Sequence, residues 1–268
     1  MGFFNTTKGG SGVELNKIYN EDCLEGMKRI PDGSVDMILC DLPYGTTACK
    51  WDTIIPFEPL WEQYDRIIKN NGAIILFGVE PFSSLLRTSN IDNYKYDWYW
   101  NKKHGANFAQ ANKRPLKSIE VASVFYKKQP TYNPQKIINP KGVEGRSKYA
   151  PSKQKKVFEG QVSMNAEYAG VGSKYEADKL LPKCLIEFSR EYKPIHPTQK
   201  PVSLFEYFIK TYTNEGETVL DNCMGSGTTA IASMRTGRNY IGFELDKGYF
   251  DIANDRIDKH KREMAKDN

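Results

Sequence analysis

Short apolar runs alternate along the chain with segments of helical periodicity, and this alternation predicts an α/β fold. Residues 35–40, apolar except for Asp36, and residues 73–77 are runs of strand length, as expected for strands buried on both faces. We expect further strands at residues 17–20, 96–100, 119–126, 218–220 and 240–243, and helices at 24–30, 57–70, 82–88, 201–212, 226–234 and 247–264. Strands that alternate with helices indicate a mostly parallel sheet.

Residues 127–193 interrupt this pattern. They are rich in Lys, Gln, Asn, Pro and Gly and have weak periodicity, which predicts an insert or a long functional loop. Residues 1–14 are expected to be a flexible N-terminus. The 268 residues are enough for one large domain that carries a small insert.

The cysteines and histidines favour a reducing compartment and no metal site. There are 5 cysteines and 3 histidines. The cysteine number is odd and no CxxC pair occurs, which argues against a disulfide framework and a thiolate zinc site. No apolar run approaches the roughly 20 residues of a membrane span, and the N-terminus has no signal-peptide core. We therefore expect a cytoplasmic protein with no membrane partner.

Positive charge is concentrated in the middle of the chain. Residues 101–200 carry 20 Lys and Arg against 8 Asp and Glu, a net charge of +12, whereas the other residues carry 18 basic and 25 acidic side chains, a net charge of −7. A localised positive field suits a polyanion, although a solvated basic surface gives the same count. Aromatic residues between these cations could stack on bases or form a small core.

A glycine loop follows the predicted strand at 218–220. Gly225 and Gly227 allow a sharp turn and a close approach to a ligand, and the helix that follows favours an anionic group. Glu244 lies 19 positions after Gly225 at the end of the next strand, where an acid can bind the hydroxyls of a ribose. The loop therefore favours an adenosine-containing cofactor over a P-loop, which would need a following Lys. An ordinary strand-turn-helix joint remains the alternative.

A second loop, Asp41-Leu42-Pro43-Tyr44, follows the strand at 35–40. The proline restricts Leu42 to extended conformations and so directs its carbonyl. Asp41 and that carbonyl are hydrogen-bond acceptors, and Tyr44 offers a ring face. Two acceptors beside a stacking surface suit the exocyclic amine of a flat heterocycle.

These motifs resemble those of the amino-directed DNA methyltransferases that use S-adenosylmethionine. Asp41-Leu42-Pro43-Tyr44 resembles their D-P-P-Y motif, with Leu42 in place of the first proline, and Asp221–Gly227 resembles their F-x-G-x-G loop. Residues 19–24 and the run His196-Pro197-Thr198-Gln199-Lys200-Pro201 resemble two further elements. The catalytic motif comes first, as in the circularly permuted beta class. The resemblance implies a Rossmann-like methyltransferase sheet, with a catalytic half at 15–126, a target-recognition insert at 127–193 and a cofactor-binding half at 194–268.

The resemblance also implies a role for each matched residue. Asp41 and the Leu42 carbonyl would hold the target amine, Pro43 would stiffen the loop, and Tyr44 would stack on a flipped base. The implied cofactor-binding residues are Asp22, Thr198, Lys200, Asp221, Gly225, Gly227 and Glu244. S-adenosylmethionine is the implied cofactor, without a metal. From the basic middle of the chain we add candidate DNA contacts at Lys113, Arg114, Lys117, Lys127 and Lys128.

The sequence thus predicts a DNA methyltransferase that modifies adenine N6 in double-stranded DNA. In this family a leading Asp favours adenine, and cytosine N4 is the nearest alternative. A related enzyme acting on RNA or protein is disfavoured by the motif order, and an NAD oxidoreductase leaves the Asp41–Tyr44 loop unexplained. A catalytically silent DNA-binding module is the alternative from another class. A homodimer and a cognate restriction nuclease stay open as partners.

Overall fold

The computed structural model describes residues 12–45, 52–138, 179–191 and 199–266. The chain divides into two compact units, one formed by residues 1–133 and 183–268 and the other by residues 134–182. In the second unit, the described residues form an antiparallel pair of short strands, β6 (Ile137–Ile138) and β7 (Lys179–Leu180). This unit lies within the 127–193 span for which target recognition is predicted.

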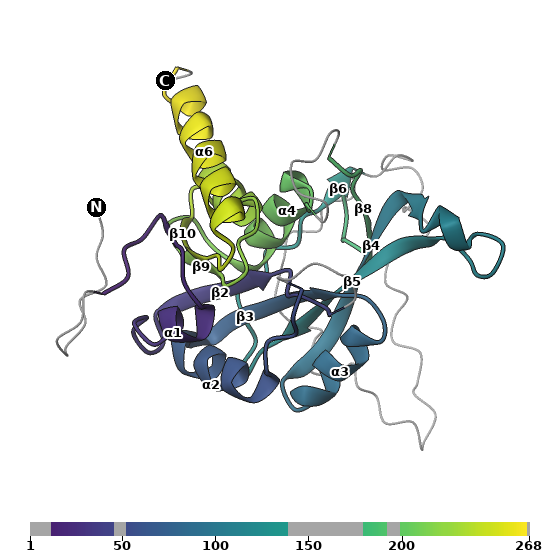
Figure 1. The fold of residues 1–268 in the computed structure, drawn as a ribbon, viewed down its shortest axis with the longest axis horizontal. Helices are drawn as coiled ribbons and strands as arrows, with labels where there is room; N and C mark the ends of the chain where they lie inside the picture. Colours follow the sequence, from purple (N-terminus) through teal and green to yellow (C-terminus); the bar gives the residue numbers. More distant parts are fainter. Residues whose placement is uncertain (1–11, 46–51, 139–178, 192–198, 267–268) are drawn as a thin grey trace, which may run out of the picture. The chain divides into compact units, whose positions relative to one another are not determined.

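An eight-stranded sheet runs through the first unit (Figure 1), in the order β1-β10-β9-β2-β3-β5-β4-β8. Its strands are β1 (Lys17–Tyr19), β2 (Val35–Cys40), β3 (Ile68–Gly78), β4 (Tyr94–Ala106), β5 (Lys117–Phe125), β8 (Leu185–Glu187), β9 (Thr218–Asp221) and β10 (Asn239–Phe243). Adjacent strands are parallel, except that β5 is antiparallel to both β3 and β4. The predicted mostly parallel α/β sheet is therefore confirmed.

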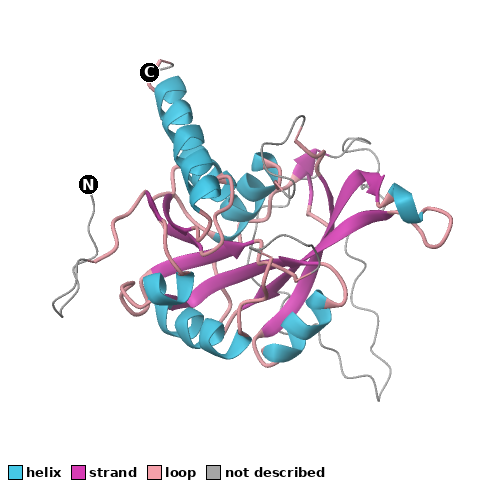
Figure 2. Cartoon of the chain, viewed as in Figure 1, coloured by secondary structure: helices cyan, strands magenta, loops and turns pink. Residues whose placement is uncertain are grey.

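Helices cover both faces of this sheet (Figures 1 and 2). One face carries α1 (Cys23–Met27), α2 (Phe57–Ile67) and α3 (Phe82–Ser89), and the other carries α4 (Val202–Tyr212), α5 (Thr228–Arg235) and α6 (Lys247–Met264). A short 3-10 helix, η1 (Phe108–Gln110), lies between β4 and β5. Within the described ranges, no helix is long and apolar enough to cross a bilayer.

The central strands are apolar because both of their faces are covered. In β3, Ile75 and Phe77 belong to the cluster under α4 and α5, whereas Ile74 and Leu76 belong to the cluster under α2 and α3. Successive side chains of a strand point to opposite faces, so a strand between two helical layers needs apolar residues at every position. The apolar runs in the sequence mark this central position.

Several predicted boundaries differ from the structure: the helix predicted at 24–30 spans Cys23–Met27, and the strand predicted at 96–100 spans Tyr94–Ala106. The helix predicted to run to residue 70 ends at Ile67, and β3 begins at Ile68 instead of residue 73. Ile68 adopts an extended backbone and pairs with Val35 of β2, so sheet pairing overrides the helical periodicity. The N-terminus also differs, because Val13, inside the segment predicted to be flexible, is fully buried.

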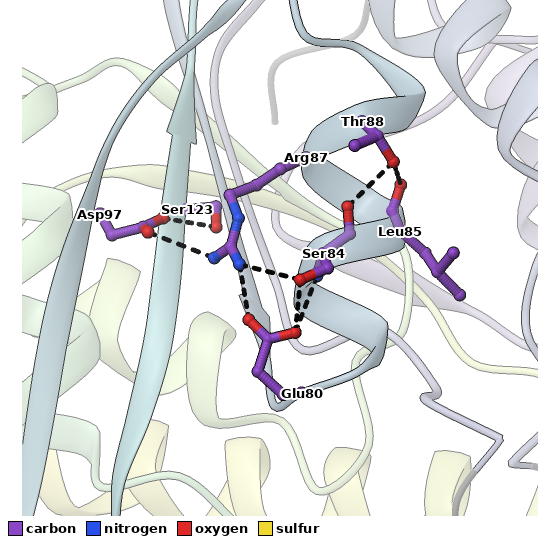
Figure 3. Close-up of polar contacts among 7 residues, drawn as sticks. All are labelled: Glu80, Ser84, Leu85, Arg87, Thr88, Asp97 and Ser123. Carbon is purple, nitrogen blue, oxygen red and sulfur yellow. Dashed lines mark hydrogen bonds and ion pairs between the residues drawn. The ribbon is translucent and has the colours of Figure 1, made fainter.

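A polar network holds α3 to the sheet (Figure 3). Arg87 on α3 donates to Asp97 of β4 at 3.2 Å and to Glu80 at 2.5 Å. Ser123 of β5 donates to the other oxygen of Asp97 at 2.7 Å. Asp97 thus accepts from both a helix and the neighbouring strand, which fixes α3 against the β4–β5 pair.

Asp36 joins three central strands from within the sheet. This largely buried carboxylate of β2 accepts a hydrogen bond from the Thr218 amide of β9 at 3.0 Å and one from the Lys69 ammonium of β3 at 2.6 Å. Asp36 thereby gives the buried Thr218 amide an acceptor at the point where β2 meets β9. These two strands precede the Asp41–Tyr44 loop and the glycine loop.

We expect Asp36→Ala to lower the free energy of unfolding by roughly 1–3 kcal/mol, because it leaves the buried Thr218 amide without its acceptor. Urea denaturation measures the change. The matched control is Asp32→Ala, which removes an exposed carboxylate paired with Arg66 and is expected to cost less than about 1 kcal/mol. Equal losses for the two variants would contradict the role given to Asp36.

Candidate active site

Four acidic residues meet at the carboxyl edge of the parallel strands. Asp41 and Glu244 directly follow β2 and β10, Asp221 is the last residue of β9, and Asp22 follows β1 by three positions. Because these four strands are adjacent and parallel, their carboxyl ends lie at one edge, where open α/β sheets bind ligands.

One cavity of about 390 Å³ opens at this edge, a size within the usual range of small-molecule sites, roughly 300–1,000 Å³. Its lining includes every described candidate catalytic and cofactor residue except Gly227: Asp22, Asp41, Leu42, Pro43, Tyr44, Lys200, Asp221, Gly225 and Glu244. Thr198 lies outside the described residues. The two loops that the sequence singled out therefore line one space.

Asp52 holds the Asp41–Tyr44 loop in place. One of its carboxylate oxygens accepts hydrogen bonds from the backbone amides of Tyr44 at 2.8 Å and Gly45 at 2.9 Å. The Tyr44 hydroxyl in turn donates to Asp41, and the Tyr44 ring rests against Phe82, with centroids 5.0 Å apart. Both the backbone and the side chains of the loop are thus fixed before any ligand binds.

A chain of alternating charges runs from Asp41 into the sheet. The buried Lys200 ammonium donates to Asp41 Oδ2 and lies 3.3 Å from Glu120 Oε2 on β5. The other Glu120 oxygen accepts from the buried Lys102 ammonium of β4 at 2.6 Å. The cluster therefore joins two carboxylates and two ammonium groups, and its net charge is zero.

The charge state of the cluster follows from this pairing. Burial raises the pKa of Asp41, and the Lys200 ammonium opposes that shift. Burial alone would also raise the pKa of Glu120, but Lys200 and Lys102 lower it to about 2. For Lys200 the two carboxylates outweigh burial and raise the pKa of the ammonium group. Glu120 and Lys200 are therefore charged near neutral pH.

The glycine loop adopts the conformation that its sequence predicts. Gly225 and Gly227 have φ of 53° and 82°, in the left-handed region that favours glycine. A side chain at Gly227 would also lie within 3.3 Å of Ala253 on α6. Gly227 thus shapes the turn, whereas Gly225 lines the cavity.

Glu244 fastens this loop to the sheet. Its carboxylate accepts from the Gly225 amide at 2.7 Å and from the Asp246 amide at 2.9 Å, one bond to each oxygen. Each oxygen keeps a lone pair that can accept from a hydroxyl group. Burial raises the pKa of Glu244, as expected for a carboxyl on a cavity wall.

Asp22 and Asp221 have structural partners as well. Asp22 caps α1 by accepting from the Leu24 amide at 2.8 Å. Asp221 accepts from the Thr229 hydroxyl and from the Cys223 amide, the latter at 3.0 Å. Burial raises the pKa of Asp221 to about 6.

The five candidate DNA contacts fall into two groups. Lys113 and Arg114 are exposed in the β4–β5 connection, and Lys117 begins β5. Because β5 is antiparallel to β3, this end of β5 lies at the edge that holds the cavity. Lys127 and Lys128 follow the other end of β5, where Lys127 pairs with Asp65 of α2 at 3.0 Å. The structure does not bring the two groups together.

Three residues at the site escaped the sequence reasoning: Asp52, Glu120 and Lys102. Asp52 stands outside every motif, so nothing local marks it. Glu120 was detectable, because an ionisable residue inside a predicted strand needs a partner when it is buried. That partner, Lys200, is distant in sequence, and only the folded chain identifies it.

The sheet and the cavity at its carboxyl edge define a Rossmann-like α/β fold with a ligand site where such folds carry one. A family model for DNA methylases matches residues 35–255, and the chain belongs to this family of N6 and N4 amino-group DNA methyltransferases. The match spans both loops and the strands between them.

Relatives and solved structures agree with this assignment. The chain is 27% identical to the type II methyltransferase M1.MboII of Moraxella bovis, over 90% of this chain and 96% of that protein. It superposes on the crystal structure of M1.HpyAVI in complex with SAM with a TM-score of 0.59 and 25% identity, covering 90% of this chain and 98% of that one. The cytosine-N4-specific PvuII DNA methyltransferase gives a TM-score of 0.61 at 16% identity, over 91% of this chain and 86% of that one, which shows a shared fold.

We expect Asp52→Ala to slow methyl transfer about tenfold or more, because hydrogen bonds to a charged acceptor contribute about 1.5–3 kcal/mol and this loop positions Asp41 and Tyr44. Single-turnover assays with DNA measure the rate. Asp52→Asn keeps an acceptor oxygen and should recover much of the rate. If the alanine variant is as fast as the parent enzyme, Asp52 does not organise the loop.

Proposed function

We propose that this DNA methyltransferase transfers a methyl group from S-adenosylmethionine to adenine N6 in double-stranded DNA, after the base has left the helix. The observation that carries the proposal is that the Asp41–Tyr44 loop lines the same cavity as Gly225 and Glu244. A reaction between a bound base and a bound cofactor requires both to share one space.

The part of the cavity wall that contains Gly225 and Glu244 fits the cofactor. Glu244 offers a free lone pair on each carboxylate oxygen to a ribose diol. Apolar lining from Leu24, Phe205 and Leu245 offers packing surface to an adenine ring and a methionine chain. When bound, S-adenosylmethionine supplies a methyl group already activated by the sulfonium charge. The chain's own residues then bind and orient the acceptor amine.

Asp41 is the residue on which this orientation depends. An exocyclic amine conjugated to its ring is a poor nucleophile. Hydrogen bonds from its N–H groups to the Asp41 carboxylate and the Leu42 carbonyl would favour the nucleophilic nitrogen and stabilise the positive charge that develops on it. The Tyr44 hydroxyl, bonded to Asp41, sets the angle at which its ring can stack on the base. Moving the base into the cavity costs a few kcal/mol, which phosphate contacts can offset.

The leading Asp of the loop supports adenine over cytosine. The Moraxella bovis homologue named above is described as a type II methyltransferase, so a restriction nuclease acting at the same DNA site in a bacterial cytoplasm is the proposed biological partner. Cytosine N4 uses the same amine chemistry and is an outcome of the following test.

Incubation with mixed-sequence DNA and labelled S-adenosylmethionine, followed by nucleoside mass spectrometry, is expected to yield N6-methyladenine. Asp41→Ala should abolish the product, because it removes an acceptor of the target amine, and should leave DNA binding intact, because it removes none of the candidate DNA contacts. N4-methylcytosine would contradict the proposed base. Cofactor binding without methylated DNA would indicate a silent DNA-binding module, and a fully active Asp41→Ala variant would remove Asp41 from the mechanism.

Salt dependence distinguishes the two basic groups. The double variant Lys113→Ala/Arg114→Ala should weaken DNA binding. It should also make the slope of the logarithm of the binding constant against the logarithm of the salt concentration shallower by about two, because each lost phosphate contact removes about one counterion. Fluorescence anisotropy at several salt concentrations measures both quantities. The matched control, Lys127→Ala/Lys128→Ala, also removes two positive charges but lies at the far edge of the sheet and should leave the slope unchanged. The reverse pattern would place the DNA on the opposite edge.

A further inference from the structure

The charge cluster behind Asp41 contains two residues to which neither the motifs nor the proposed mechanism gives a role. Glu120 and Lys102 lie on β5 and β4, and both side chains are largely buried, with exposed fractions of 14% and 5%. Burying charged side chains is costly unless each finds a partner. Here each cation contacts a carboxylate, and Glu120 is the carboxylate that contacts both.

Lys200 lies between two competing carboxylates. It donates a hydrogen bond to Asp41 Oδ2, and it approaches Glu120 Oε2 to 3.3 Å as an ion pair that does not complete a hydrogen bond, since this buried oxygen has no hydrogen-bond partner among the described residues. The ammonium group also lies 5.3 Å from the centre of the Phe77 ring. Glu120 therefore competes with Asp41 for the ammonium and retains an acceptor site for it.

Asp41 still has acceptor capacity in this arrangement. Its Oδ1 accepts from the Tyr44 hydroxyl and its Oδ2 from Lys200. A carboxylate oxygen has two lone pairs, so each oxygen can accept one more hydrogen bond. An amine that enters the cavity can thus reach Asp41 while Lys200 stays in contact with Glu120.

We propose that Glu120, supported by Lys102, is a positioning residue for methyl transfer: it shares the Lys200 ammonium with Asp41, so that Asp41 stays ionised yet remains a strong acceptor for the target amine. The inference rests on the proposed function, because it requires Asp41 to accept from the substrate. Without Lys200, Asp41 would be a buried carboxyl with no cation. Without Glu120, Lys200 would act on Asp41 alone and weaken it as an acceptor.

The two losses act on Asp41 in opposite directions. Removing the Lys200 charge raises the pKa of Asp41, whereas removing the Glu120 charge lowers it. Four other groups around Asp41 are the same in both variants: Tyr44 and Asp52 on its own loop, Cys40 on β2 and Asp221 on β9. Lys102 on β4 differs, because it loses its carboxylate partner in Glu120→Gln. Asp221, with a pKa of about 6, contributes the same acidic titration to each variant, so the direction of any difference reports on Asp41.

The test is the pH profile of the single-turnover methylation rate on DNA, from about pH 5 to about pH 9, which isolates chemistry from product release. For Glu120→Gln we expect the pH-independent rate to be lower by about fivefold or more. We also expect the acidic limb of the profile, where the rate falls as the pH decreases, to move to lower pH by on the order of one unit. For Lys200→Met we expect the limb to move to higher pH. Dissociation constants for DNA and S-adenosylmethionine should stay within about twofold of the parent values for Glu120→Gln, because Glu120 is largely buried and does not line the cavity.

Two further variants guard the interpretation. Glu187→Gln removes an equal charge from β8, where Glu187 is exposed and contacts Lys103 at 3.7 Å, and it should leave the profile unchanged. Lys102→Met/Glu120→Gln removes the buried pair together, so that no unpartnered ammonium is left if the single variant does not fold. It should move the acidic limb in the same direction as Glu120→Gln.

The outcomes separate this inference from the proposed function. If Asp41→Ala is inactive, and the Glu120 and Lys200 variants move the limb in opposite directions, the inference holds. If Asp41→Ala is inactive but the limb stays in place, or moves the same way in both variants, Glu120 has no such role and the proposed function stands. If Asp41→Ala is active, Asp41 is not the acceptor of the target amine, and the inference fails while the methylated product still decides the proposed function.

Discussion

The buried ion pair between Asp41 and Lys200 is the interaction on which the site depends. A carboxylate at the carboxyl edge of a sheet, 20% exposed, needs a cation to remain charged, and Lys200 arrives from a segment 159 positions further along the chain. Glu120 and Lys102 balance the pair from behind. The site therefore requires β2, β4, β5 and the segment before α4 to assemble together. A cluster in which every buried charge has a partner can tolerate burial, and its central carboxylate keeps lone pairs for a substrate.

Sheet topology explains why the order of the motifs along the chain matters little. The catalytic loop follows β2 and the glycine loop follows β9, far apart in sequence, yet β2 and β9 are adjacent parallel strands. Asp36 fastens them together from inside the sheet. Once the strands pair, both loops emerge at the same edge and enclose one cavity. A permuted chain can thus form the site of a methyltransferase, because the chemistry depends on which strand ends are neighbours.

Local signals in the sequence predicted most of the architecture. The runs at 35–40 and 73–77, apolar except for Asp36, identified central strands, since strands covered on both faces have few polar positions. Gly225 and Glu244 were recognisable because turn geometry and an acid at a strand end are local features. The end of α2 at Ile67 was not predicted, because the pairing of Ile68 with Val35 decides it. The roles of Asp52 and Glu120 also depend on partners that folding supplies, as does the separation of Lys113 from Lys127 to opposite edges of the sheet.

The most direct measurement is a crystal structure of the protein with DNA that carries its methylation site and with a non-reactive analogue of S-adenosylmethionine. The mechanism predicts an adenine outside the helix, with its exocyclic nitrogen at a hydrogen-bonding distance of about 3 Å from Asp41, and Lys200 closer to Glu120 than in the free protein. A flipped base whose amine contacts other groups, with Asp41 bonded only to Lys200, would contradict it.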